Sequence, residues 1–233
     1  MTFNGKTNLG VQHSEIYDFL KESVSSKYIY DENILSKFLN IYYEWIKSSK
    51  LNNLSGLDKF HNLGFIHGTS QSFDFFYAEN KNRRMRCFKG DFLYHTLSWR
   101  NNNKGWKYLD RDCIKGVSFS LSKAFFGTHR IRIGLRCKKD FNDDPVDVFT
   151  SMGMVSKISA GVGYDICNNF EPDYNQNKFR DKQLTICKEL NIQPSDSVLY
   201  GITDENHKEF GDYDRGSRWR RVCISSLMGD MNE

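Results

Sequence analysis

A serine-rich segment that ends in a lysine stands near the middle of the chain. It reads Ser-Phe-Ser-Leu-Ser-Lys from Ser118 to Lys123, and an arginine followed by Ile-Gly comes later, at Arg132. A lysine amine held at a strand–helix junction can attack an aldehyde, because its surroundings can lower its pKa. Serine hydroxyls can hydrogen-bond a phosphate, and an arginine can neutralise it. The segment therefore indicates a site for a phosphate-bearing aldehyde; a surface lysine beside a strand is the alternative.

A second candidate segment, Gly68-Thr69-Ser70-Gln71, precedes an expected helix. Backbone N–H groups and hydroxyls at the start of a helix form a site for anions. The same residues also make an ordinary helix cap, which needs no ligand. The position of this segment before Lys123 in the chain favours the anion-binding interpretation.

The pattern S-x-S-K followed by R-x-G resembles the cofactor-lysine signature of the fold-type I pyridoxal-phosphate enzymes, the aminotransferase class I/II group. The resemblance implies that Lys123 is the Schiff-base lysine and also transfers the α-proton of the substrate. Arg132, rather than Arg130, is the implied phosphate arginine, because it keeps the R-x-G context. The full set of phosphate-binding residues that the resemblance implies is Gly68, Thr69, Ser70, Gln71, Ser120, Ser122 and Arg132.

Two further segments match the family pattern in the same order along the chain. Phe92-Leu93-Tyr94-His95 follows an expected strand, and Tyr94 or His95 could stack on a pyridine ring. Near the C-terminal end, Arg221 begins an apolar segment in the place where the family has an arginine that binds the substrate α-carboxylate. The alternatives are two aromatic residues at a strand edge and an edge strand flanked by basic residues.

The chain departs from the family in the interval before the lysine. Fold-type I enzymes place there a carboxylate that pairs with the pyridine nitrogen and makes the cofactor an electron sink. The stretch between Trp106 and Lys123 is too short for the buried strands that carry this carboxylate. Asp110 and Asp112 lie in this stretch, without an apolar strand before them. Either the chain is a shortened relative with impaired cofactor binding, or one of these aspartates substitutes for the missing group.

The patterns predict an α/β fold: an aminotransferase-like large domain with a reduced central sheet, a helical N-terminal segment and a small C-terminal α+β part. The expected parts are residues 1–62, 63–145 and 146–233. Expected helices start at Ser14, at Asp31, after Gln71 (with Phe73, Phe76 and Tyr77), at Pro145 (continuing to about Phe170) and at Asn175 (to about Leu190). Expected strands cover 84–88, 117–120, 131–135, 198–201 and 221–225.

The amino-acid composition argues against some classes of function, nucleic-acid binding and metal binding among them. The hydrophobic content of 39% supports a packed core, and the net charge of +4 is too nearly balanced to favour nucleic-acid binding through the basic runs 81–89 and 215–221. The six cysteines form no C-x-x-C pair, so we expect reduced thiols and no metal site. Neither an apolar leader nor a membrane-length apolar run is present, which predicts a cytoplasmic protein.

The leading hypothesis is therefore a pyridoxal-phosphate-dependent, aminotransferase-like protein that acts on an amino compound, with catalysis weakened by the missing carboxylate. The alternative is a non-catalytic remnant that acts as a protein-binding partner subunit. The family resemblance also implies a homodimer, because fold-type I sites are usually completed by both subunits.

Overall fold

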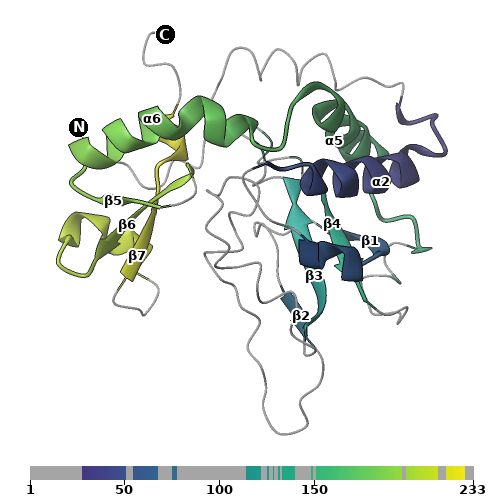
Figure 1. The fold of residues 1–233 in the computed structure, drawn as a ribbon, viewed down its shortest axis with the longest axis horizontal. Helices are drawn as coiled ribbons and strands as arrows, with labels where there is room; N and C mark the ends of the chain where they lie inside the picture. Colours follow the sequence, from purple (N-terminus) through teal and green to yellow (C-terminus); the bar gives the residue numbers. More distant parts are fainter. Residues whose placement is uncertain are drawn as a thin grey trace, which may run out of the picture.

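Sheet A carries the segments of the candidate site and packs under two helices (Figure 1). The computed structural model describes residues 28–50, 55–67, 75–77, 114–121, 125, 128, 131, 133–139, 148, 151–195, 198–214 and 219–228. The elements of sheet A are β1 (Asn62–His67), β2 (Phe75–Tyr77), β3 (Ile114–Ser120) and β4 (Ile133–Lys138). Sheet B contains β5 (Gln193–Pro194), β6 (Tyr200–Asp204) and β7 (Trp219–Cys223). The helices are α2 (Ile34–Lys47), α5 (Lys157–Asn169) and α6 (Tyr174–Glu189), with short 3₁₀ helices η2 (Ser55–Lys59), η5 (Lys208–Tyr213) and η6 (Ser225–Leu227).

The described elements thus mix α-helices with small sheets, in which neighbouring strands are antiparallel. In sheet A the strand order is β1-β4-β3-β2, so β4 is paired on both sides. Leu135 of β4 is the Cα partner of Phe65 on one side and of Phe119 on the other. All three side chains are buried, and they form part of an apolar face that α2 and α5 cover.

Helix α2 has the amphipathic spacing expected from its sequence. Ile34, Phe38, Tyr42 and Ile46 recur every four residues and are buried, so one stripe of the helix faces sheet A and α5. The predicted helix is confirmed, but the predicted cap is wrong. Asp31 lies before the helix start, where its carboxylate accepts from the Asn33 N–H at 2.9 Å and pairs with Lys37 at 2.8 Å.

Two glycines allow α5 to approach its neighbours closely. A Cβ at Gly161 would collide with the ring of Tyr28, and a Cβ at Gly163 would collide with the ring of Phe38 and lie 3.1 Å from Leu121. Glycine is a poor helix former, which weakened the prediction of a helix here. The packing explains both residues, because the bare backbone lets the Phe38 ring of α2 lie directly against α5.

The expectation of one helix from Pro145 to about Phe170 is wrong. Met152 N–H donates to the Val148 carbonyl at 3.0 Å, but Gly153 then adopts a left-handed conformation with φ of 73°. That conformation ends a right-handed helix. Helix α5 starts anew at Lys157, after Ser156, whose side chain accepts from the Ser159 N–H at 3.1 Å.

The expected helix after Gln71 is also contradicted where the structure describes it. Residues 75–77 form β2, which pairs with β3 through Phe75 and Val117. Aromatic residues favour strands, and pairing with a neighbouring strand outweighs a short helical pattern. The expected helix from Ser14 and the expected strand 84–88 lie outside the described residues.

Helix α6 packs on sheet B through a buried glutamine. Gln183 is wholly buried, and its Nε2 donates to the Tyr200 carbonyl at 2.8 Å and lies 3.1 Å from the Ser195 carbonyl. The Arg180 guanidinium donates to the same Ser195 carbonyl at 2.6 Å. The predicted helix at 175–190 is confirmed, and the two C-terminal strands lie within a few residues of their predicted positions.

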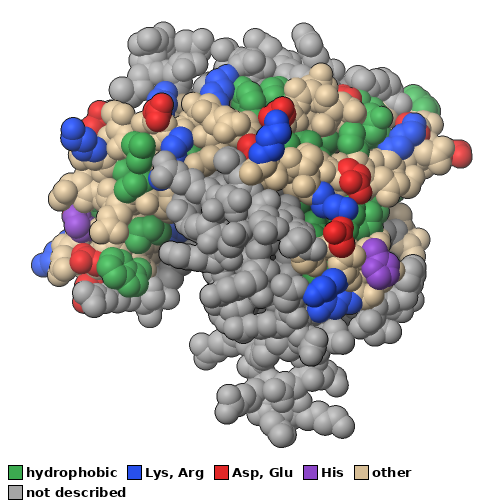
Figure 2. All heavy atoms as spheres, in the orientation of Figure 1, with side chains coloured by type: hydrophobic (Ala, Val, Ile, Leu, Met, Phe, Trp, Pro, Cys, Tyr) green, Lys and Arg blue, Asp and Glu red, His purple; other side chains and the backbone are tan. Residues whose placement is uncertain are grey.

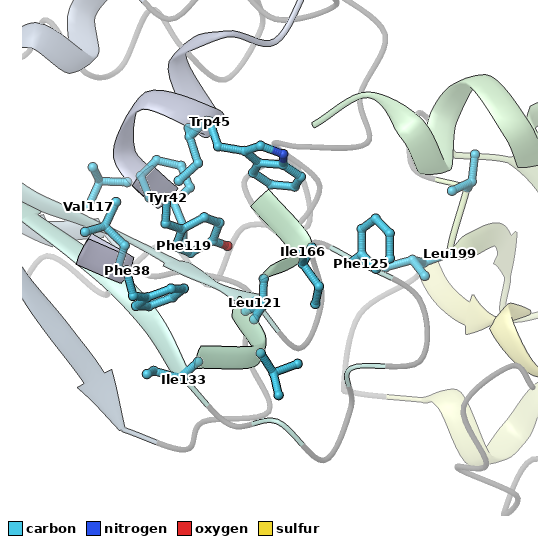
Figure 3. Close-up of a cluster of buried hydrophobic side chains, with 14 of the residues drawn as sticks. Phe38, Tyr42, Trp45, Val117, Phe119, Leu121, Phe125, Ile133, Ile166 and Leu199 are labelled. Atoms are coloured by element: carbon cyan, nitrogen blue, oxygen red, sulfur yellow. The ribbon is translucent and has the colours of Figure 1, made fainter. Parts of the chain in front are cut away.

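A junction joins α2 to the segment between α5 and α6. The indole Nε1 of Trp45 donates to the Phe170 carbonyl at 2.5 Å, and the Ser49 hydroxyl donates to the buried Asp173 carboxylate at 2.6 Å. The Lys50 N–H donates to the other oxygen of that carboxylate at 2.6 Å. Figure 3 shows Trp45 above the buried cluster that α2, β3 and α5 share. None of the described helices is both long and apolar enough to cross a membrane.

The α2–α5 contact predicts that Gly163→Ala destabilises the protein although alanine favours helix. The added methyl group must displace the Phe38 ring, which costs about 1–3 kcal/mol of the free energy of unfolding. Urea unfolding would measure this loss. Gly211→Ala is the matched control, because a Cβ there meets nothing within 4 Å. Equal stabilities of the two variants would contradict the proposed close packing.

Candidate functional site

Three strand ends meet at one edge of sheet A. His67, the last residue of β1, is the Cα partner of Ile133, the first residue of β4. Ser120, the last residue of β3, is the partner of Gly134. Because β1 and β3 both run opposite to β4, the segments that leave β1 and β3 and the segment that enters β4 all do so at this edge.

These are the segments that carry most of the predicted site. Gly68 follows His67 directly in the sequence, Arg132 directly precedes Ile133, and Lys123 comes two residues after Leu121. The structure therefore describes the strand ends, but not the candidate side chains in the segments attached to them. Outside the described residues lie Gly68, Thr69, Ser70, Gln71, Tyr94, His95, Asp110, Asp112, Ser122, Lys123 and Arg132, and also the side chain of Ser120.

The chain after β3 makes a helical turn that is held by a buried threonine. The Phe125 N–H donates to the Leu121 carbonyl at 3.3 Å, the i to i+4 bond of an α-helix. The Thr128 hydroxyl lies 2.8 Å from that carbonyl and 2.7 Å from the Phe125 carbonyl, and Thr128 is wholly buried. A hydroxyl proton can satisfy either acceptor. This hydrogen bond between Leu121 and Phe125 is the helical turn that the structure describes after β3.

Aromatic packing anchors the far end of this turn. The Phe125 ring lies 4.8 Å from the Phe170 ring and 5.5 Å from the Tyr174 ring, between centroids. In Figure 3, Phe125 extends away from sheet A toward Leu199, which precedes β6. Phe125 is therefore packed against the segment at the start of α6, and Leu121, directly after β3, is buried in the core that sheet A shares with α2 and α5.

A buried arginine on β4 was missed by the sequence analysis. Arg136 is wholly buried, and its Cα partners are Gly64 of β1 and Ser118 of β3. Strand alternation places it on the opposite face of sheet A from Leu135, away from α2 and α5. A single charged residue between apolar ones in a strand is the signal that could have indicated it. A buried guanidinium brings positive charge to this face, three residues along β4 from Ile133, which lies at the edge where the strand ends meet.

The predicted carboxylate-binding arginine lies in the other sheet. Arg221 is in β7 of sheet B, half-buried, with its guanidinium 4.6 Å from the centroid of the Tyr200 ring. Its Cα partner is Ile202. Arg221 thus lies in a different sheet from β3, the strand that precedes Lys123 in the sequence, and Figure 1 shows the two sheets on opposite sides of the α5–α6 connection.

The cysteines that the structure describes, Cys137, Cys167, Cys187 and Cys223, are free thiols. Burial raises the pKa of Cys137 and of Cys167, and raises the pKa of Cys187 to about 11. These thiols are therefore protonated at neutral pH, and none of them is a nucleophile there. In the described part of the chain, His, Cys, Asp and Glu side chains form no group of three that could hold a metal ion.

No family model, curated protein or solved structure matches this chain significantly.

Thr128→Val tests how the helical turn is held. Valine keeps the shape of threonine but cannot donate to the carbonyls of Leu121 and Phe125, and we expect a loss of about 1–3 kcal/mol in the free energy of unfolding. Thr185→Val on the exposed side of α6 is the control and should change stability by less than about 0.5 kcal/mol. Urea denaturation measures both. A Thr128 variant as stable as the control would show that the hydroxyl does not hold the turn.

Proposed function

We propose that this chain is a pyridoxal-phosphate-dependent, aminotransferase-like protein that acts on an amino compound. The main support for this proposal is that the last residues of β1 and β3 and the first residue of β4 lie together at one edge of sheet A. The sequence attaches to these ends the Gly68–Gln71 segment, the Ser122-Lys123 pair and Arg132. These three segments are far apart in the sequence, and the family motif needs them close together. They are attached to strand ends that lie side by side in sheet A.

The donor set suits a phosphorylated aldehyde. Backbone N–H groups and hydroxyls of the Gly68–Gln71 segment, the hydroxyls of Ser120 and Ser122 and the guanidinium of Arg132 would hold the phosphate. The Lys123 amine would hold the aldehyde carbon from the neighbouring helical turn. Arg136, buried three residues after the start of β4, adds positive charge that favours a bound anion.

When bound, the cofactor supplies an electron sink for charge that develops at the substrate α-carbon. The Lys123 Nζ would take a proton from that carbon and return it. Tyr94 would stack on the ring, and Arg221 would bind the substrate carboxylate once sheet B approaches the edge of sheet A. Asp110 or Asp112 would have to face the ring nitrogen; without one of them the reaction is slow.

The same proposal gives the fold a finer description. Sheet A with α2 and α5 would be what is left of an aminotransferase-like large domain, and α6 with sheet B would be the small C-terminal part. Loss of the strands that normally precede the lysine would leave β3 to pair with β2 and β4. Position 62 was the predicted boundary between the N-terminal segment and the cofactor-binding part. The packing of α2 on sheet A supports one continuous core for residues on both sides of this boundary.

Addition of pyridoxal 5'-phosphate to the purified chain should produce an absorbance band near the violet edge of the visible spectrum, because a protonated imine forms with Lys123. Lys123→Ala should abolish the band, and Lys208→Ala, at an exposed position in η5, should keep it. Borohydride reduction followed by peptide mass spectrometry locates the adduct. Absence of both the band and a trapped adduct on Lys123 would refute cofactor binding.

The second candidate function is a partner subunit without catalysis, and we propose a second copy of the chain as its partner. Apolar side chains are exposed in and just before α5: Met152 (68%), Met154 (59%), Val148 (53%) and Ile158 (38%). Exposed apolar residues that cluster in one segment are typical of a protein interface. On the face that Figure 2 shows, by contrast, acidic and basic side chains are interspersed among the described residues, which favours no polyanionic partner.

Light scattering after gel filtration tests the self-association. The chain should elute as a dimer, and the double variant Met152→Glu and Met154→Glu should shift it to a monomer, since a buried carboxylate opposes the contact. Leu184→Glu, at a similarly exposed position on α6, is the control and should stay dimeric. A monomeric chain at high concentration would contradict the proposal.

A further inference from the structure

A cavity of about 390 Å³ lies between the C-terminal end of α6 and the outer part of sheet B. It is distant in the sequence from the Lys123 segment, and neither the motif analysis nor the proposed function uses it. Its size lies in the range of small-molecule sites. Its lining includes the apolar residues Ile192 and Ile202 and the polar or charged residues Lys188, Thr203, Asp204 and His207.

An indole and a carboxylate stand next to each other in this cavity. Trp219, the first residue of β7, is the Cα partner of Asp204, the last residue of β6. Side chains that are directly opposite in an antiparallel pair lie on the same face, about 5 Å apart at their Cβ atoms. Trp219 is 53% exposed, which is unusual for so large an apolar side chain. Both residues line the cavity.

The Asp204 carboxylate is held in position by its own turn. The Asn206 backbone N–H donates to it at 3.0 Å and the Asn206 side-chain amide at 3.1 Å. These hydrogen bonds, with the backbone contribution largest, lower the pKa of Asp204, so that the group is an anion at neutral pH. Because a carboxylate has about four acceptor positions, it can receive a further donor.

The neighbouring histidine completes the polar wall. His207 Nδ1 lies 2.7 Å from the Thr203 hydroxyl and 3.5 Å from an Asp204 oxygen. Its backbone carbonyl accepts from the Arg220 guanidinium at 2.8 Å, so the turn after β6 is tied to β7. The wall is therefore rigid before any ligand arrives, which limits the entropy that binding costs.

The end of α6 and the residues after it contribute the rest of the lining. Ile192 is buried, and it packs so closely on Gly201 that a Cβ there would collide with it. Cys187 also lines the cavity, and its thiol stays protonated because burial raises its pKa to about 11. Lys188 lies at the exposed rim, where its flexible stem can keep the ammonium in water.

We propose that this cavity binds a small organic cation, an ammonium group carried on an apolar or aromatic body. The ammonium would lie against the face of the Trp219 indole and pair with the Asp204 carboxylate. The apolar body would lie against Ile202, which strand alternation places on the same face of β6 as Asp204. The site would work with or without the aldehyde cofactor, and so it goes beyond the proposed function.

The test uses the full chain without added cofactor and three probes of similar size: benzylammonium, benzyl alcohol and benzoate. Binding is followed by NMR titration. The cationic probe should bind at least about tenfold more tightly than the other two, given the usual strength of a cation on an indole beside a carboxylate. Benzyl alcohol or benzoate binding as tightly as the cation, or no binding of the cation at millimolar concentration, would overturn the proposal.

Variants assign the binding to the named residues. Trp219→Ala and Asp204→Asn should each weaken the cationic probe roughly tenfold, and Trp219→Phe should weaken it less, since phenylalanine keeps an aromatic face. Glu205→Gln removes an exposed carboxylate next to Asp204 that does not line the cavity, and it should leave binding unchanged. Unchanged binding in both Trp219→Ala and Asp204→Asn would refute the site. Lys123→Ala should bind the probe normally, which separates this proposal from the aminotransferase-like one.

Discussion

The pairing of β4 with β1 on one side and β3 on the other is the constraint on which the rest of the structure depends. It places Leu135 between Phe65 and Phe119, which builds the apolar face that α2 and α5 cover. A slip of one residue would turn Leu135 outward and carry the charge of Arg136 under the helices, so the burial of these side chains selects the register. The same register brings together the strand ends at which the candidate segments begin.

Elements with a strong local pattern could be predicted from the sequence, and elements decided by packing could not. The apolar stripe of α2 and the length of α6 are visible in the sequence alone. Strand β2 has only three residues and exists because β3 offers it an edge, which no local pattern encodes. The glycines of α5 argued against a helix locally, whereas in the fold they let Tyr28 and Phe38 approach.

For the candidate site, too, local sequence patterns could be read in advance and long-range contacts could not. The residue types around Lys123 and Arg132 indicated the chemistry, and their order along the chain indicated a family resemblance. Their common departure from one edge of sheet A depends on which strands are neighbours, and that is a long-range property. The cross-strand pair of Asp204 and Trp219 was missed for this reason, since strand register decides which residues of neighbouring strands face each other.

The hydrogen bond between the Trp45 indole and the Phe170 carbonyl joins residues that are 125 positions apart in the sequence. Helix α2 is synthesised before β4 and α5, and its apolar stripe has no lasting cover until these two elements have left the ribosome. Until then this stripe is a surface that chaperones or other nascent chains can bind. Contacts of such long sequence separation also slow folding. The interval between translation of α2 and of α5 is thus the period in which this chain is most exposed to aggregation.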